Sequence, residues 1–189
     1  MRNLVFIRIA YAVDASINRK DQLAMLLNEF NETPEINLAA ALRPCIDVER
    51  WIQEIIDARP YAAVEEIFKT ANDAAAPFTA EEVNSALAHH PRIGERLSGA
   101  STEAALSSAE QSTIDPADTM TAAALRSGNV AYEEKFGQVF LIRALGRSPE
   151  EILSALHERL ENPPHTERLI IAEQLREIAL LRLKAVVNA

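Results

Sequence analysis

The chain has 189 residues, 48% of them hydrophobic, so it is long enough and apolar enough to bury the core of one domain. Its 28 acidic residues outnumber its 19 Lys and Arg residues and give a net charge of -9, with no basic cluster. This balance excludes sequence-independent binding to a nucleic-acid backbone. It is compatible with a small anionic substrate, because a few local donors decide whether such a molecule binds.

The single cysteine, Cys45, excludes an intrachain disulfide framework and fits a reducing cytoplasm. We expect a cytoplasmic protein without a membrane span, because Arg8 interrupts the apolar N-terminal stretch. Residues 1–20 lack helical periodicity, so we divide the sequence into an N-terminal extension over 1–20 and a helical domain over 21–189.

Scarce glycine and abundant Ala, Leu, Glu and Arg favour an all-α fold. Four short helices are expected first, separated by Pro34, Pro44 and Pro60. Their predicted ranges are 22–31, 35–42, 48–58 and 61–73.

Thr79 and Glu82 have the spacing of a capping box, which predicts a helix that begins there and ends between Ala88 and His90. Pro91 sets that end, because the residue before a proline disfavours the α conformation.

Two later Ser-x-x-Glu pairs predict further helix starts. Ser107 and Glu110 predict a short helix, and Ser148, followed by Pro149, predicts a longer one that ends near residues 162–164.

The last helix is expected to begin with Thr166 as its cap and to run to Val187. Its broad apolar face predicts burial between helices or at a subunit contact, and we expect a homodimer. The residues of that face are Leu169, Ile170, Leu175, Ile178, Leu181 and Leu183.

One segment departs from the helical pattern. Residues 139–142 are apolar and rich in β-branched side chains, which favours an extended segment. We therefore predict an all-α, single-domain bundle of about eight or more helices with one short extended stretch.

The chemistry-bearing residues have structural and functional interpretations side by side. His90 either ends a helix or acts as a general acid/base. Glu110 either caps a helix or partners a histidine. The helix start near Ser107 and Gln111 favours an anion through its backbone donors.

We expect neither a nucleotide cofactor nor a metal ion. The sequence has no Gly-x-Gly-x-x-Gly loop and no Gly-x-Ser-x-Gly elbow. The adjacent histidines His89 and His90 are poorly spaced for one metal, and His157 and His165 are distant in sequence.

The sequence resembles the 2-oxo-4-hydroxy-4-carboxy-5-ureidoimidazoline (OHCU) decarboxylases of urate breakdown, over residues 27–187. The motifs that carry the resemblance are Leu42-Arg43-Pro44-Cys45 with Trp51, Arg59-Pro60-Tyr61, Ala88-His89-His90-Pro91-Arg92-Ile93-Gly94, Ser107-x-x-Glu110-Gln111, Asn129-x-x-Tyr132-x-x-x-Phe136-Gly137, Gly146-Arg147-Ser148 and Ile178-x-x-Leu181-Arg182-Leu183.

The resemblance implies a cofactor-free, all-helical enzyme that forms (S)-allantoin and carbon dioxide. It places the catalytic histidine at His90 and gives Glu110 the partner role. It also implies a set of substrate-binding positions, several of which contribute backbone groups; they are Pro91, Ser107, Gln111, Phe140, Ile142, Ala144 and the flanking Arg147.

This chain departs from the family pattern in the extended segment. Gln138-Val139 stands where many relatives have Phe-Pro, and Arg143 stands where many have Cys. Two alternatives to the decarboxylase therefore stay open. One is a decarboxylase-fold enzyme with a shifted substrate, and the other is a non-catalytic helical interaction module.

Overall fold

The computed structural model describes residues 24–88, 90–95, 106–107, 109–112 and 119–187. Within these residues there are eight numbered helices and no β-strand, which confirms the all-α prediction. The predicted extension over residues 1–20 lies outside the described residues. The helices are α1 (Leu27–Glu32), α2 (Glu35–Leu42), α3 (Glu49–Asp57), α4 (Val64–Ala74), α5 (Ala80–Leu87), α7 (Thr119–Phe136), α8 (Pro149–Leu160) and α9 (Pro164–Val186).

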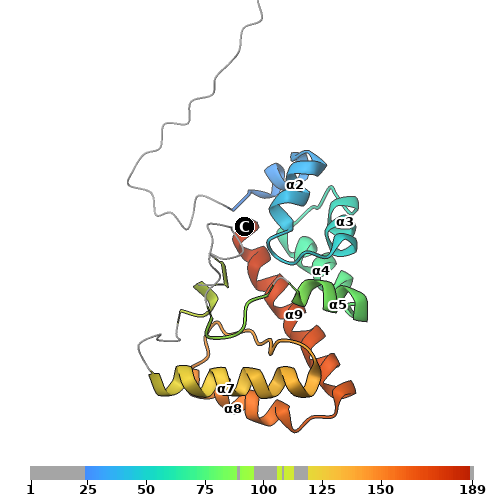
Figure 1. The fold of residues 1–189 in the computed structure, drawn as a ribbon. Coiled ribbons are helices and arrows are strands. Elements are labelled where there is room, and N and C mark those ends of the chain that lie inside the picture. Colours follow the sequence, from blue (N-terminus) through green and yellow to red (C-terminus); the bar gives the residue numbers. More distant parts are fainter. Residues whose placement is uncertain (1–23, 89, 96–105, 108, 113–118, 188–189) are drawn as a thin grey trace, which may run out of the picture.

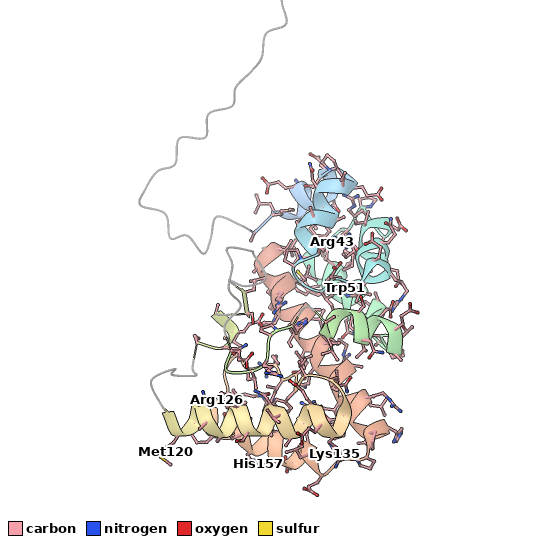
Figure 2. All side chains as sticks on the ribbon, viewed as in Figure 1. Arg43, Trp51, Met120, Arg126, Lys135 and His157 are labelled. Atoms are coloured by element: carbon pink, nitrogen blue, oxygen red, sulfur yellow. The ribbon has the colours of Figure 1, made fainter. Side chains whose placement is uncertain are left out.

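Helix α9 is the element to which both halves of the fold attach. It contacts α2, α4 and α5, which belong to the N-terminal helical group, while α7 and α8 pack against each other at its other end (Figure 1). Trp51 is fully buried within the N-terminal group, where its indole N–H donates to the Ala71 carbonyl at 2.8 Å (Figure 2). The two ends of the described chain meet in a parallel bridge between Met25 and Val187.

The predicted early helices are correct in number, with shifts at some ends. The second and third agree to within one residue, whereas the first is observed as Leu27–Glu32 and the fourth begins at Val64 rather than Tyr61. Tyr61 is instead bonded to Asn31: its backbone N–H donates to the side-chain oxygen of Asn31, and its carbonyl accepts from the side-chain nitrogen.

The two predicted capping boxes at Thr79 and Ser148 are confirmed. Each hydroxyl accepts the backbone N–H three residues later, and Glu82 or Glu151 returns a bond to the cap N–H. Local pairs of this kind need no tertiary partner, which is why the sequence reveals them.

Helix α7 is absent from the sequence predictions, because its burial pattern does not follow side-chain polarity. Asn129 is 1% exposed, whereas its apolar neighbour Val130 is 49% exposed. Gly128 allows the close approach of α8, since a β-carbon there would lie 2.6 Å from a methyl group of Leu156.

The predicted start of the last helix at Thr166 is wrong. The helix begins at Pro164 with Pro163 as its cap, because a proline at the first helical position needs no intrahelical N–H bond. Leu169, predicted on the apolar face, is 63% exposed, and Glu167 is buried instead. None of the described helices is both long and apolar enough to cross a lipid bilayer.

Gly128→Ala should destabilise the protein by about 1 kcal/mol, because overpacking against Leu156 outweighs the helix propensity gained by alanine. Urea denaturation measures the change. Ser127→Ala, at the exposed neighbouring position, is the matched control and should be neutral or slightly stabilising. A rise in stability for Gly128→Ala would show that the two helices can separate without cost.

Candidate active site

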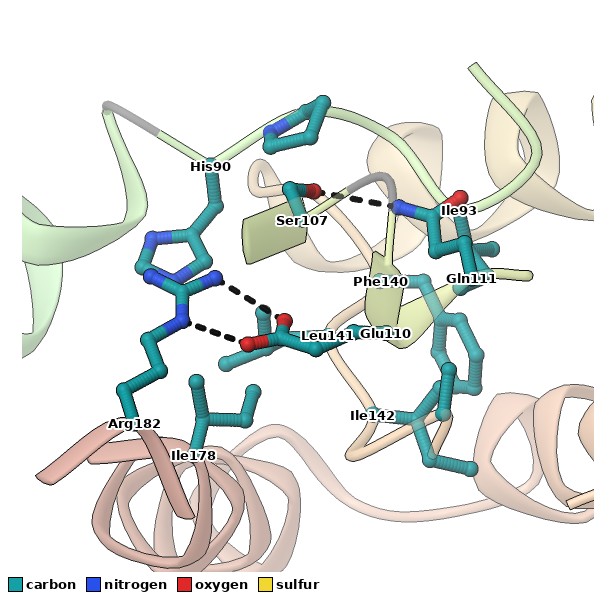
Figure 3. Close-up of a pocket in the computed structure, with 12 residues that line it drawn as sticks. His90, Ile93, Ser107, Glu110, Gln111, Phe140, Leu141, Ile142, Ile178 and Arg182 are labelled. Atoms are coloured by element: carbon teal, nitrogen blue, oxygen red, sulfur yellow. Dashed lines mark hydrogen bonds and ion pairs between the residues drawn. The ribbon is translucent and has the colours of Figure 1, made fainter. Parts of the chain in front are cut away.

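A small cavity lies where α9, the residues after α5, the short helical stretch before α7 and the segment after α7 meet (Figure 3). The residues that line it are His90, Pro91, Ile93, Ser107, Glu110, Gln111, Phe140, Leu141, Ile142, Ala144, Ile178 and Arg182.

His90 follows the end of α5, and its position is set by bonds to that helix. Its backbone N–H donates to the Leu87 carbonyl at 3.0 Å, and its Nδ1 lies 2.9 Å from the Ala86 carbonyl. Because a carbonyl oxygen only accepts, Nδ1 carries the proton, and in the neutral ring Nε2 holds the lone pair. Both roles foreseen for His90 are therefore compatible: the ring satisfies a helix end and lines the cavity.

The loop after His90 is anchored to α7. Arg92 makes a two-pronged ion pair with Glu133, with both N–O distances 2.6 Å. The buried Asn129 donates to the Ile93 carbonyl at 2.9 Å. The following Gly94 has a φ of +84°, a value that favours glycine. The wall that presents Pro91 and Ile93 to the cavity is thus fixed from behind.

Gln111 joins the two motifs that the sequence singled out. Its side-chain oxygen accepts the Gly94 N–H at 2.9 Å, and its amide nitrogen lies 3.4 Å from the Ser107 hydroxyl. The carboxamide therefore holds the histidine loop and the short helical stretch together while lining the cavity.

Glu110 forms a two-pronged ion pair with Arg182 of α9, with N–O distances of 2.6 and 2.9 Å. The Arg182 and Glu110 side chains are only 5% and 15% exposed. Arg182 also donates to the Pro44 carbonyl at 3.2 Å. The capping alternative for Glu110 does not hold, because Ser107 is itself helical and the carboxylate is turned to Arg182.

Cys45, next to Pro44, is a buried free thiol. Burial raises its pKa to about 12, a rise that the nearby Arg182 guanidinium opposes and the Glu110 carboxylate reinforces. At neutral pH the group is therefore a protonated, apolar neighbour of the ion pair.

The extended segment predicted near residues 139–142 is observed: residues 139–144 belong to no helix, and Phe140, Leu141, Ile142 and Ala144 line the cavity. Arg143 and Gln138, which depart from the family pattern, do not line the cavity. The Arg143 side chain pairs with Glu177 at 3.0 Å, and Gln138 lines a separate surface hollow beside Asn84.

The structure brings together all but one of the predicted site residues. The exception is Arg147, whose Nε donates to the Arg143 carbonyl at 3.2 Å and which does not line the cavity. The sequence predictions assign no role to Arg182. A charged residue on the apolar face of the last helix nevertheless indicates a buried partner, which the structure shows to be Glu110. Among the described residues, no group of three or more His, Cys, Asp or Glu side chains is arranged to hold a metal ion.

Residues 31–184 match the sequence profile of OHCU decarboxylases. The chain belongs to the OHCU decarboxylase family. The matched range includes every residue that lines the cavity, so the cavity lies within the family's domain.

Known members of the OHCU decarboxylase family resemble the chain over most of its length. The protein of Amia calva is 34% identical over 144 residues, which cover 75% of this chain and 71% of that protein. The protein of Haloferax volcanii is 26% identical over 161 residues, or 84% of this chain and 94% of that protein. A crystal structure of an OHCU decarboxylase in the presence of (S)-allantoin is 28% identical with a TM-score of 0.60, covering 74% of this chain and 92% of that chain.

Arg182→Met should lower the free energy of unfolding by about 3 kcal/mol, because it leaves the Glu110 carboxylate buried without its counter-charge. Adding Glu110→Gln should recover part of that loss, since the double variant buries no lone charge. Chemical denaturation of both single variants and the double variant measures the coupling. Lys69→Met, which breaks an exposed ion pair with Asp73, is the control and should have far less effect. Strict additivity of the two single variants would contradict a working buried pair.

Proposed function

We propose that this protein decarboxylates OHCU to (S)-allantoin in urate breakdown, without a cofactor. The observation that carries the proposal is the convergence of His90, Glu110 and Arg182 on one cavity in a member of this family. The non-catalytic interaction module, whose expected surface is the broad apolar face of the last helix, is disfavoured, because His90 and Glu110 line one cavity and much of that face is buried within the chain.

The reaction needs an electron sink, a base and one-sided protonation. The bond between the ring carbon and its carboxylate breaks, carbon dioxide leaves, and the electron pair stays in the ring as an enolate-like species. That species then takes a proton on one face of the neighbouring ring carbon. Because the substrate is a carboxylate and both products are neutral, one proton is consumed in total.

His90 is suited to move the proton. With Nδ1 committed to the Ala86 carbonyl, Nε2 is the basic nitrogen of the neutral ring. We infer that Nε2 takes the proton of the substrate hydroxyl and that the imidazolium returns a proton to the ring carbon. The bond to Ala86 fixes the plane of the imidazole, and a fixed donor delivers its proton to one face.

Glu110 and Arg182 set the charge of the site. The pair is neutral as a whole, but its two charges line the cavity separately. We infer that the Glu110 carboxylate stabilises an imidazolium at His90 and that Arg182 faces the anionic substrate. Among the described residues Arg182 makes three bonds from its five N–H groups, which leaves two for a substrate oxygen. We infer that Ser107 and Gln111, neutral polar residues of the cavity lining, bind the ureido moiety.

The usual family substrate fits better than a shifted one. Neither Gln138 nor the Arg143 side chain lines the cavity, so the departures from the family pattern leave its surface unchanged. Arg147 stays a predicted substrate-binding residue, and it would have to act from outside the cavity lining.

We further propose that the enzyme acts in the cytoplasm as a homodimer. The lone buried thiol of Cys45 supports a reducing compartment. Much of the α9 apolar face that suggested a dimer is buried within this chain, for example at Leu175. Met120 and Val130 of α7 are exposed apolar side chains that self-association could bury.

His90→Ala should reduce formation of (S)-allantoin to the spontaneous rate and make the product racemic, because the imidazole proposed to carry the proton is lost. The measurement generates OHCU in situ from urate and follows optical activity. His157→Ala, at an exposed position on α8 (Figure 2), is the matched control and should retain full activity. Wild-type protein that does not exceed spontaneous decay would refute the function itself, and an active His90→Ala variant would refute the role of the imidazole.

Glu110→Gln should lower kcat by about tenfold or more, since the amide keeps the shape but not the charge that balances an imidazolium. Steady-state kinetics of folded protein, checked by circular dichroism, measures the loss. Glu177→Gln makes the same chemical change outside the cavity, at the partner of Arg143, and should leave kcat unaltered. Equal kinetics for the two variants would contradict the proposed role of Glu110.

A further inference from the structure

A second buried ionic cluster contacts the cavity wall at Phe140 and Leu141. Arg159 of α8 pairs with Glu167 of α9 at 2.7 Å, and the Tyr132 hydroxyl donates to the same carboxylate. Asn162 donates to the other oxygen of Glu167 at 2.8 Å. Arg159 is 7% exposed, and Glu167 and Tyr132 are fully buried.

Arg159 touches the cavity wall directly. Its Nη1 donates to the Leu141 carbonyl at 2.7 Å, and its guanidinium lies 4.6 Å from the centre of the Phe140 ring. Phe140 packs edge-on against Tyr132, with ring centres 5.1 Å apart. One planar cation therefore holds both the backbone and the side chain of adjacent wall residues.

Gln174 of α9 makes a second tie to the wall. Its side-chain oxygen accepts the Arg143 N–H at 3.0 Å, and Gln174 is 9% exposed. The two ties hold Leu141 and Arg143, the residues on either side of Ile142.

The ties fix how Ile142 faces the cavity, because the C=O and N–H of one trans peptide point in opposite directions. Holding the Leu141 carbonyl toward Arg159 turns the Ile142 N–H away from it. Holding the Arg143 N–H toward Gln174 likewise turns the Ile142 carbonyl away. Ile142 is 7% exposed and lines the cavity, and within the described residues neither of its backbone groups is hydrogen-bonded.

Stability alone is a weak reason for such a cluster. A buried ion pair gains little over apolar packing of the same volume, because both charges lose their hydration. A cluster whose donors reach a cavity wall supplies something that apolar packing does not, namely a defined direction for backbone groups.

We propose that Arg159 and Gln174 are positioning residues for the reaction. They lock the two peptide planes around Ile142, so that its N–H and C=O form a donor and acceptor pair for the amide edge of the bound substrate. The identity of that substrate rests on the proposed function, whereas the locking of the wall does not. Substrate orientation, and with it one-sided protonation, follows from the fixed pair.

The test uses Arg159→Lys and Gln174→Met in the full chain. Lysine keeps the charge opposite Glu167 but cannot hold the carboxylate, the Leu141 carbonyl and the Phe140 ring together. Methionine keeps the volume of Gln174 but removes the acceptor for the Arg143 N–H. Leu38→Ala, a fully buried change on α2 away from the cavity lining, controls for lost stability.

Two readouts separate the proposal from the function. Without substrate, amide hydrogen exchange of Arg143, whose N–H is bonded to Gln174, should quicken about tenfold or more in both variants, and not in Leu38→Ala. With substrate, kcat/KM should fall about tenfold to a hundredfold, and the excess of (S)-allantoin should drop.

Variants that match Leu38→Ala in both readouts would overturn the proposal, and so would faster exchange with unchanged kcat/KM. A wild-type protein without decarboxylase activity would refute the proposed function and with it the catalytic purpose of the positioning. Amide exchange would then still decide whether Arg159 and Gln174 hold the wall.

Discussion

The ion pair between Arg182 and Glu110 is the constraint on which the cavity depends. Arg182 comes from α9, Glu110 from the short stretch before α7, and the third bond of Arg182 reaches Pro44 after α2. Three parts of the chain that are distant in sequence are thereby held around one guanidinium. Because both side chains are nearly buried, the loss of either leaves an uncompensated charge. The pair therefore fixes how these three parts of the chain pack, and it adds little net stability.

Residues of the histidine loop and its neighbours also combine a structural bond with a place in the cavity lining. His90 satisfies a carbonyl at the end of α5, and that bond also selects which ring nitrogen is basic. Gln111 bridges two loops through Gly94 and Ser107 and still lines the cavity. The sequence leaves the structural and the chemical interpretations of these residues as alternatives. In the folded protein the structural hydrogen bond orients the side chain that lines the cavity.

Local signals explain which parts of the fold the sequence predicts. The capping boxes at Thr79 and Ser148 place two helices correctly, because every bond in them lies within four residues. Helix α7 has no such local signal. The buried Asn129 donates its hydrogen bond to Ile93, 36 residues away, so its burial cannot be inferred from neighbouring residues. The partner of Glu110 lies 72 residues along the chain, so no local pattern distinguishes a capping glutamate from one paired with Arg182.

The extended segment shows why changes in side chains need not change the site. Arg143 contributes its N–H to Gln174 and turns its side chain to Glu177, away from the cavity lining. A wall that presents backbone groups is indifferent to the identity of such residues, provided that its peptide planes are held. The side chains that matter are then those that hold the peptide planes of the wall, namely Arg159 of α8 and Gln174 of α9. The proposed role of Arg159 and Gln174 implies that a change in a wall side chain is tolerated, whereas a change in either support is not.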